Sequence, residues 1–339
     1  MVKRYRWVLA AVGILFLCGV FLGWVLLSSF SPKGAGTYIY VDRGDTPAVV
    51  FEKMQRVASP RQMLGVRLTA FLLGYGGHVR AGRYETGGGV SSLRLVRNLR
   101  NGRQSAVQLV IPVVHTVNDL AARLSGQLQA DSATLVRTFT DAGTLESCGV
   151  DTFTVLTLFI PNTYEVYWDI KPLDLLKRMK KERDSYWDGK RSAEAEAMGL
   201  TPDEVYTLAS VVEQETANEK ERPMIAGMYL NRLRQGMKLQ ADPTVKFALK
   251  DFGLRRIMHA HLTTDSPYNT YLHEGLPKGP ICIPSRNAIE SVLHYTHHNY
   301  LYMCAKEDFS GTHNFAATYE EHMANARRYA DALNKRGIR

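Results

Sequence analysis

TPDEVYTLASVVEQET (residues 201–216) decides the fold of the C-terminal half, because it predicts a helix whose start and phase are both defined. Thr201 is a favoured N-cap, Pro202 suits the first turn, and Glu204 completes a capping box. At about 100° per residue, one stripe of this helix holds Val205, Leu208, Val212 and Glu215. The apolar stripe therefore ends in a carboxyl group.

Glu213 and Glu215 are two residues apart, so they cannot share one face of the helix. Glu213 projects about 160° away from Glu215, on the side that carries Tyr206 and Gln214. We expect the surroundings of Glu213 to be wetter. Of the pair, Glu215 is the better candidate for chemistry.

A carboxyl group on an apolar stripe loses hydration, which favours its neutral form and raises its pKa. A neutral carboxyl at physiological pH can act as a general acid for an acetal oxygen. The alternative is that Glu215 lies at the helix end and pairs with Arg222 or Arg232. Glu219 and Glu221 are interpreted as solvated charges at the helix junction.

The run WVLAAVGILFLCGVFLGWVLL (residues 7–27) is uncharged and apolar. At about 1.5 Å per residue it can cross a hydrocarbon core of about 30 Å, and it exceeds the core of a cleavable signal peptide. It predicts an uncleaved transmembrane anchor, although small residues at 28–29 and 34–36 leave processing open. Lys3, Arg4 and Arg6 precede the run, so residues 1–6 are expected to be a cytoplasmic tail and the remaining chain to be exported.

Residues 36–150 predict a small binding region and a link. TYIYV (37–41) and RYET (83–86) look like strands, and Thr46 and Ser59 are placed to cap two helices between them. This β-α-α-β order is the plan of a LysM-like module. The region has no catalytic spacing, so we expect it to bind or position a ligand. Residues 151–339 would then form the catalytic domain.

The net charge of +9 and the pI near 9.3 suit nucleic acid, an anionic membrane or an acidic polymer. No zinc-finger spacing, RNP-like strand or long basic helix is present, so nucleic acid is not an expected partner. Outside the anchor, which holds Cys18, three cysteines remain: Cys148, Cys282 and Cys304. We expect free thiols, the alternative being a disulfide between the last two.

Several motif-like runs follow in order. They are ASVVEQET (209–216), GMYLNRL (227–233), LQADPTV (239–245), SPYNTY (266–271), GLPKGPICIPS (275–285), YLYMCA (300–305) and THNFAATYEEH (312–322). Together they resemble the YceG-like endolytic murein transglycosylases, the MltG family. The resemblance covers roughly residues 161–325, with a weaker part at 81–103 that is similar to the family's LysM-like region.

The resemblance implies a membrane-anchored enzyme outside the cytoplasm that cuts peptidoglycan glycan strands internally. The family's catalytic residue is the second glutamate of its E-x-E-T motif, which is Glu215 here. Gln214 stands where lysine is frequent, and IPNTY (160–164) replaces the more usual FPDTY. The product would be a 1,6-anhydro-MurNAc end, formed from the MurNAc-GlcNAc bond without water, metal or cofactor. Cell wall synthases are possible partners, and one role would be to terminate glycan elongation.

Six residues are candidates for binding the glycan: Gln240, Asp242, Tyr268, Asn269, Tyr271 and His313. Asp242 precedes Pro243, so the favoured interpretation of its side chain is a helix N-cap. Asn269 is the strongest of the six, on a loop that Pro267 would fix. His313 lies on a loop that can face a cleft.

Two other functions remain open on the sequence alone. The histidines suggest a metal hydrolase, but no HExxH or spaced Asp/His set accompanies them, so no metal site is expected. A non-catalytic wall-binding or scaffold protein is the second alternative. For the fold we expect an α+β protein with an N-terminal transmembrane helix, a small LysM-like domain and a larger mixed α+β catalytic domain.

Overall fold

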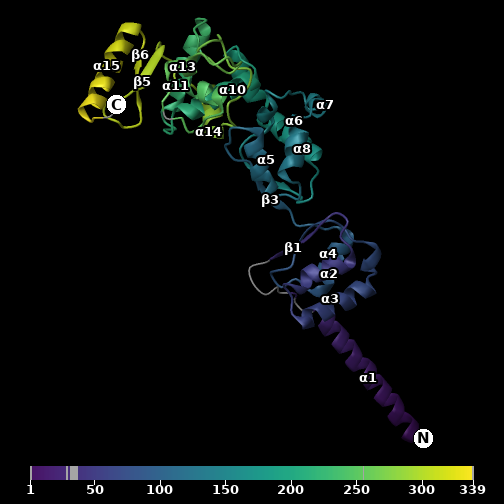
Figure 1. The fold of residues 1–339 in the computed structure, drawn as a ribbon. Helices are drawn as coiled ribbons and strands as arrows, with labels where there is room; N and C mark the ends of the chain where they lie inside the picture. Colours follow the sequence, from purple (N-terminus) through teal and green to yellow (C-terminus); the bar gives the residue numbers. More distant parts are fainter. Residues whose placement is uncertain (1, 28–29, 31–36, 255, 338–339) are drawn as a thin grey trace. The chain divides into compact units, whose positions relative to one another are not determined.

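The computed structural model describes residues 2–27, 30, 37–254 and 256–337, and it shows a mixed α+β protein (Figure 1). The chain forms two compact units. Unit 1 holds residues 1–109, 127–130 and 164–170, and unit 2 holds residues 110–126, 131–163 and 171–339. The α+β fold class is confirmed, whereas the predicted domain ranges stay a prediction.

Unit 1 begins with α1 (Val2–Leu27). Within it, Tyr5–Leu27 has a mean hydropathy of 2.6 and is almost entirely outside the protein interior. This helix is long and apolar enough to cross a membrane. The apolar run therefore forms a continuous helix, as the sequence predicts.

The predicted β-α-α-β order is present in unit 1. Its elements are β1 (Tyr38–Val41), α2 (Pro47–Gln55), α3 (Pro60–Leu72) and β2 (Gly82–Glu85). A short 3-10 helix (Tyr75–Gly77) lies between α3 and β2, and α4 (Ser92–Asn101) follows β2. Strands β1 and β2 are antiparallel, with Ile39 opposite Tyr84. Thr46 and Ser59 cap α2 and α3 through their side chains, as expected.

After α4, residues 107–197 form a second pair of strands and several helices. Strand β3 (Val107–Val110) pairs with β4 (Thr163–Val166). The helices are α5 (Val117–Ser125), α6 (Ser132–Thr140), α7 (Ala142–Ser147), the 3-10 helix Val155–Leu158, α8 (Pro172–Tyr186) and α9 (Gly189–Ala197). The side chain of Thr116 caps the start of helix α5.

Helix α10 (Pro202–Glu215) lies at the centre of unit 2. Thr201 and Glu204 make both halves of the capping box. The helix packs against α11 (Arg222–Arg234), α12 (Asp242–Leu249) and α14 (Arg286–Leu293).

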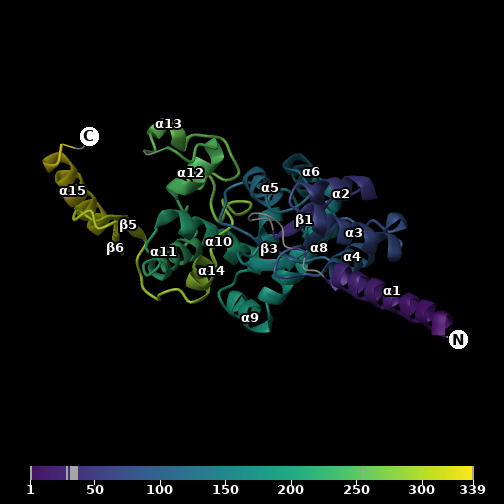
Figure 2. The same ribbon diagram turned by 90° about the horizontal axis from the view of Figure 1, so that it is seen from below.

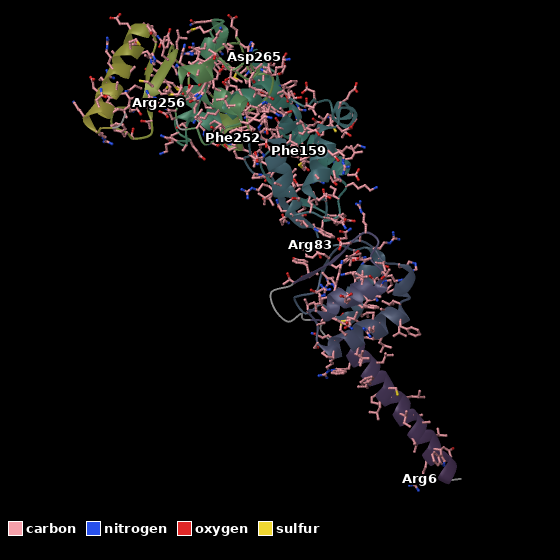
Figure 3. All side chains as sticks on the ribbon, in the orientation of Figure 1. Arg6, Arg83, Phe159, Phe252, Arg256 and Asp265 are labelled. Carbon is pink, nitrogen blue, oxygen red and sulfur yellow. The ribbon has the colours of Figure 1, made fainter. Side chains whose placement is uncertain are left out.

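The expectation of one apolar and one wet side on α10 is wrong. Every residue from Val205 to Val212 is buried, because helices surround α10 on more than one side. Tyr206 is fully buried, and its hydroxyl donates to the carbonyl oxygens of Leu156 (2.9 Å) and Phe159 (2.7 Å). Phe159, labelled in Figure 3, is fully buried as well.

The C-terminal part of unit 2 is a β-hairpin covered by the last helix. After α13 (His259–Leu262), strands β5 (Tyr302–Ala305) and β6 (His313–Ala316) pair in antiparallel register, with Ala305 opposite His313. Helix α15 (Tyr319–Lys335) packs against both strands, as Figure 2 also shows. His313 is the first residue of β6, next to the loop that joins the two strands.

The cysteines of the described chain are free thiols, as predicted. Cys148 and Cys282 are buried, and Cys304 is half-buried. The alternative disulfide between Cys282 and Cys304 is therefore wrong. Burial raises the pKa of the Cys282 thiol to about 12, so this group stays protonated.

Candidate active site

Glu215 is the last residue of α10, and its side chain lines a cavity of about 220 Å³. The volume lies below the roughly 300–1,000 Å³ of pockets that enclose a small molecule, which fits a cavity that takes one part of a longer ligand. The cavity wall also includes Met228, Tyr229, Arg232, Leu239, Gln240, Asp242, Tyr271, Met303, Cys304, Ala305 and His313. Polar groups from four segments thus converge on one carboxyl group.

The pKa of the Glu215 carboxyl group is raised, as the sequence predicts. Its pKa rises from 4.5 to about 7, chiefly because the surrounding atoms exclude water from the carboxyl group. The hydroxyl of Tyr229 donates a hydrogen bond to Oε1 and opposes this rise, whereas the charge of Asp242 adds to it. Near neutral pH the Glu215 carboxyl is therefore present in both protonation states.

The alternative in which Glu215 pairs with an arginine is wrong. Arg222 instead forms an ion pair with Glu213, at 2.8 Å. The guanidinium of Arg232 donates to the carbonyl oxygens of Leu301 (2.5 Å) and Leu239 (2.9 Å). Arg232 thereby ties α11 to the turn before α12 and to the start of β5.

Glu213 does not lie in a wet environment, contrary to expectation. Its carboxylate accepts from Arg222 and from the hydroxyl (2.5 Å) and backbone N–H (3.1 Å) of Ser285, the N-cap of α14. Arg222 also donates to Asn287 (3.0 Å). This nearly buried network joins α10, α11 and α14 and holds the end of α10 in place.

Asp242 and Tyr271 form a hydrogen-bonded pair beside Glu215. The Tyr271 hydroxyl donates to Oδ1 of Asp242 at 2.6 Å, and burial together with that carboxylate raises the pKa of Tyr271. The favoured N-cap role of Asp242 is wrong, because Ala241 is the capping position and Asp242 is the first helical residue. Its carboxylate is turned to the cavity instead.

Gln240 lies on the cavity wall in a strained conformation. Its φ of 51° is in the left-handed region, which is uncommon for a residue other than glycine. The backbone N–H of Gln240 donates to the Thr270 carbonyl (3.1 Å), and its side-chain oxygen accepts from Arg232 (3.4 Å). These contacts hold an amide group at the edge of the cavity.

His313 reaches the cavity from the hairpin and is held there by Glu221. The two carboxylate oxygens of Glu221 accept from the His313 backbone N–H (2.7 Å) and from Nδ1 (2.9 Å). A carboxylate can only accept, so Nδ1 carries hydrogen and Nε2 is left for a ligand. Interpreting Glu221 as a solvated charge is therefore wrong, since it is only 8% exposed, whereas Glu219 is exposed as expected.

Two of the six candidate binding residues do not line the cavity. Tyr268 packs against Phe247, with ring centroids 4.6 Å apart, and against Phe153. Asn269 is fully buried, and its amide donates to the carbonyl oxygens of Leu262 (2.9 Å) and Thr264 (2.8 Å). Both residues brace the loop that carries Tyr271, and the ranking of Asn269 as the strongest candidate is wrong.

Sequence reasoning missed three residues of the site: Tyr229, Arg232 and Glu221. Tyr229 was present only within the motif GMYLNRL and was not a candidate for the site. Its spacing of three residues from Arg232 places both on one face of α11, and this was the available signal. The pairing of Glu221 with His313 joins residues far apart in sequence, so no local pattern indicates it.

Within residues 2–27, 30, 37–254 and 256–337, no group of three or more His, Cys, Asp and Glu side chains is placed to hold a metal ion. His298, for example, contacts the Met224 carbonyl oxygen at 2.9 Å and the Tyr300 backbone N–H at 3.0 Å. The His298 ring is thus occupied by contacts within the protein.

The fold and the cavity define a class: a protein with an apolar N-terminal helix and a polar cavity that holds one carboxyl group of raised pKa. The YceG-like family profile matches residues 39–328. The chain therefore belongs to the YceG-like family. The earlier resemblance to this family is confirmed.

Two curated relatives are each named endolytic murein transglycosylase. The protein from Bacillus subtilis is 35% identical over 166 residues, which is 48% of this chain and 44% of the relative. The protein from Streptococcus pneumoniae is 32% identical over 163 residues, or 47% of this chain and 28% of the relative. The matched region thus spans less than half of either relative.

A solved structure supports the fold over a larger share of the chain. It is the 2.6 Å crystal structure of a YceG-like protein from Listeria monocytogenes, 25% identical in sequence. The superposition has a TM-score of 0.55 and covers 85% of this chain and 98% of the Listeria chain. The two proteins share the same overall fold.

Proposed function

We propose that this protein is a lytic transglycosylase that cuts peptidoglycan glycan strands internally. The observation that carries the proposal is Glu215, a carboxyl group with a pKa of about 7 on the wall of a polar cavity. The names of the Bacillus and Streptococcus relatives support the substrate and the reaction. The enzyme class is a carbon–oxygen lyase.

In the first step, neutral Glu215 protonates the glycosidic oxygen between MurNAc and GlcNAc. The bond from that oxygen to the anomeric carbon breaks, and GlcNAc leaves with the proton as its new hydroxyl. Tyr229 donates to Oε1, and burial raises the pKa of Tyr229 well above its usual value, so this hydroxyl stays a donor. It stabilises the carboxylate that forms when Glu215 gives up its proton.

In the second step, the C6 hydroxyl of MurNAc attacks its own anomeric carbon. The Glu215 carboxylate accepts the hydroxyl proton and returns to its starting form. A 1,6-anhydro ring closes, and no water enters the product. Because the nucleophile belongs to the same sugar, much of the entropic cost of a bimolecular attack is avoided, and one catalytic carboxyl suffices where ordinary glycosidases use two.

The other polar groups of the cavity would bind and orient the sugar. Asp242 lies near enough to raise the pKa of Glu215, and its negative charge would stabilise the positive charge that develops at the anomeric carbon. Gln240 and Tyr271 can bond to hydroxyl or N-acetyl groups. Nε2 of His313, with Glu221 fixing the ring, supplies a further contact.

The anchor and unit 1 fit the same activity. Helix α1 would fix the protein in the cell membrane, with the basic residues 3–6 at the cytoplasmic side and the catalytic part outside the cytoplasm. The β-α-α-β part of unit 1 would act as a LysM-like module that holds the glycan, within a LysM-like and linking region at 36–150 and a catalytic domain at 151–339. Interaction with wall synthases would let the enzyme terminate strand elongation.

The test is to incubate the full chain, solubilised in detergent, with purified glycan strands and with membrane-linked nascent strands. The full chain is needed because Phe30 is fully buried in the core of unit 1, so a fragment that starts at residue 36 would lose a core side chain. We expect shorter strands from the parent protein and none from Glu215→Gln. Binding of strands without cleavage of either substrate would favour the scaffold alternative and overturn the proposal.

A further inference from the structure

We propose that an exposed apolar face of α3 lies on the surface of the membrane that α1 enters, and holds unit 1 against the lipid headgroups. This face, the α3 stripe, consists of Leu64, Leu68, Phe71 and Leu72. The inference goes beyond the enzymatic function and depends only on α1 being a membrane span. It assigns a second membrane contact, by a helix outside the anchor.

Among the residues that the structure describes, none covers the α3 stripe, which is a large apolar surface. Leu64, Phe71 and Leu72 are 56%, 82% and 54% exposed, and Leu68 is half-buried. Their spacings of four, three and one residues place them on one side of the helix. The opposite side of α3 is also apolar and lies in the core of unit 1, where it contributes Met63, Val66 and Ala70.

A helix with apolar residues on both sides is unusual at a water-exposed surface. One apolar side is explained by the core of unit 1. The other side needs an apolar neighbour, because an exposed apolar cluster of this kind marks an interaction site. The position of the stripe relative to α1 identifies that neighbour.

Helix α3 packs directly against the membrane-spanning helix. The guanidinium of Arg61, in the first turn of α3, lies 4.0 Å from the ring centroid of Trp24 near the end of α1. Val25 is buried, and the backbone N–H of Phe30 donates to the Val90 carbonyl (2.6 Å). Both ribbon views place α3 beside the end of α1 that is opposite Arg6 (Figures 1, 2 and 3).

This packing puts the α3 stripe at the level of the headgroups. Trp24 lies in the last part of the span Tyr5–Leu27, where the helix leaves the hydrocarbon, and tryptophan prefers that interface. Leu64 and Leu68 follow Arg61 at three and seven residues, so they share its side of α3. From this contact the stripe continues along the helix for about 16 Å, at about 1.5 Å per residue.

Charge complementarity favours a lipid surface over another protein. Arg61 and Arg67 are exposed. Arg61 precedes the stripe on the same side of α3, and Arg67 lies along one edge of it. Arginines beside an apolar stripe are typical of helices that lie in the membrane interface, where the apolar side chains enter the acyl boundary and the cations meet lipid phosphates. The occupant we propose is therefore a bilayer that contains anionic phospholipid.

The experiment uses the full chain in vesicles of phosphatidylcholine and phosphatidylglycerol, with the photoreactive residue p-benzoylphenylalanine at single positions. Phe71 is the test position. Trp7, 79% exposed on α1, is the positive control, and Tyr319, 63% exposed on α15, is the negative control. After irradiation, lipid adducts are measured by mass spectrometry.

We expect lipid adducts at Phe71 several-fold above those at Tyr319 and comparable to those at Trp7. Adding Leu64→Glu and Leu72→Glu should lower the Phe71 adducts several-fold and leave the Trp7 adducts unchanged. Crosslinks from Phe71 only to protein, whether to a second copy or to another chain, would overturn the proposal. So would adducts no higher than at Tyr319, whereas a lack of adducts at Trp7 would refute the anchor itself.

Discussion

The proposed chemistry depends on one carboxyl group, that of Glu215. Replacing Glu215 by glutamine keeps the shape but removes the transferable proton. General acid–base catalysis contributes about 10²–10⁴-fold, so we expect the rate of strand cleavage to fall by at least that factor while strand binding is retained. Glu219→Gln, an exposed position four residues further along, is the matched control and should cleave at the parent rate.

The pH dependence of cleavage reports the same group. Since the pKa of Glu215 is raised to about 7, the protonated fraction and the rate should fall as the pH rises through this value. The Tyr229 hydrogen bond lowers that pKa, so Tyr229→Phe should move the alkaline limb of the pH–rate profile to higher pH. An unchanged or downward-shifted limb in the variant would contradict the assigned hydrogen bond.

Glu215 should also make the folded protein less stable as the pH rises. Its pKa is about 7 in the folded protein and 4.5 when unperturbed, so the stability from keeping its proton is fully present below pH 4.5 and is lost as the pH rises through 7. Glutamine stays neutral at every pH. Above pH 7, the free energy of unfolding of Glu215→Gln should therefore exceed that of the parent by up to about 3 kcal/mol. Denaturant titrations should find no such difference near pH 4.5.

At the scale of elements, the junction of α10, α11 and α14 depends on the Glu213–Arg222 ion pair. Glu213→Ala leaves a nearly buried guanidinium without its carboxylate and should cost about 3–5 kcal/mol of stability. The double variant Glu213→Leu/Arg222→Met removes both charges and should recover much of that loss. Urea denaturation compares the two, and a double variant as unstable as the single one would contradict the charge argument.

The elements themselves were largely predictable because their ends carry local signals. Thr201, Ser59 and Thr116 cap helices where the sequence indicates, and the strands of unit 1 pair as expected. Errors arose where tertiary packing overrides local pattern. Helix α10 is buried all round because neighbours cover the side that holds Glu213, and a helical phase alone cannot show this.

The same limit explains the errors in the site. Asp242-Pro243 has the composition of a helix cap, yet Tyr271 donates to its carboxylate from a distant loop. Asn269 has an amide that could bind a sugar, but this amide already donates hydrogen bonds to two carbonyl oxygens of its own loop. A sequence shows which side chains can bond, whereas the fold decides which bonds are already made within the protein.

At the scale of the whole molecule, the anchor and the reaction are separable. The site in unit 2 is built from residues 215–313, and α1 contributes nothing to the cavity. The full chain in detergent should therefore cleave short soluble strands as it does in vesicles. The measurement is the cleavage rate per enzyme molecule in detergent and in vesicles. Cleavage of short strands in vesicles alone would contradict the independence of the site from the anchor.

In the proposed mechanism, Glu215 directs an intramolecular attack and not hydrolysis. The most direct measurement is mass spectrometry of the strand ends produced in heavy-oxygen water. We expect 1,6-anhydro-MurNAc ends, lighter than reducing ends by one water molecule and free of the heavy isotope. Reducing MurNAc ends that carry the heavy oxygen would show that water is the nucleophile and would contradict the transglycosylase mechanism.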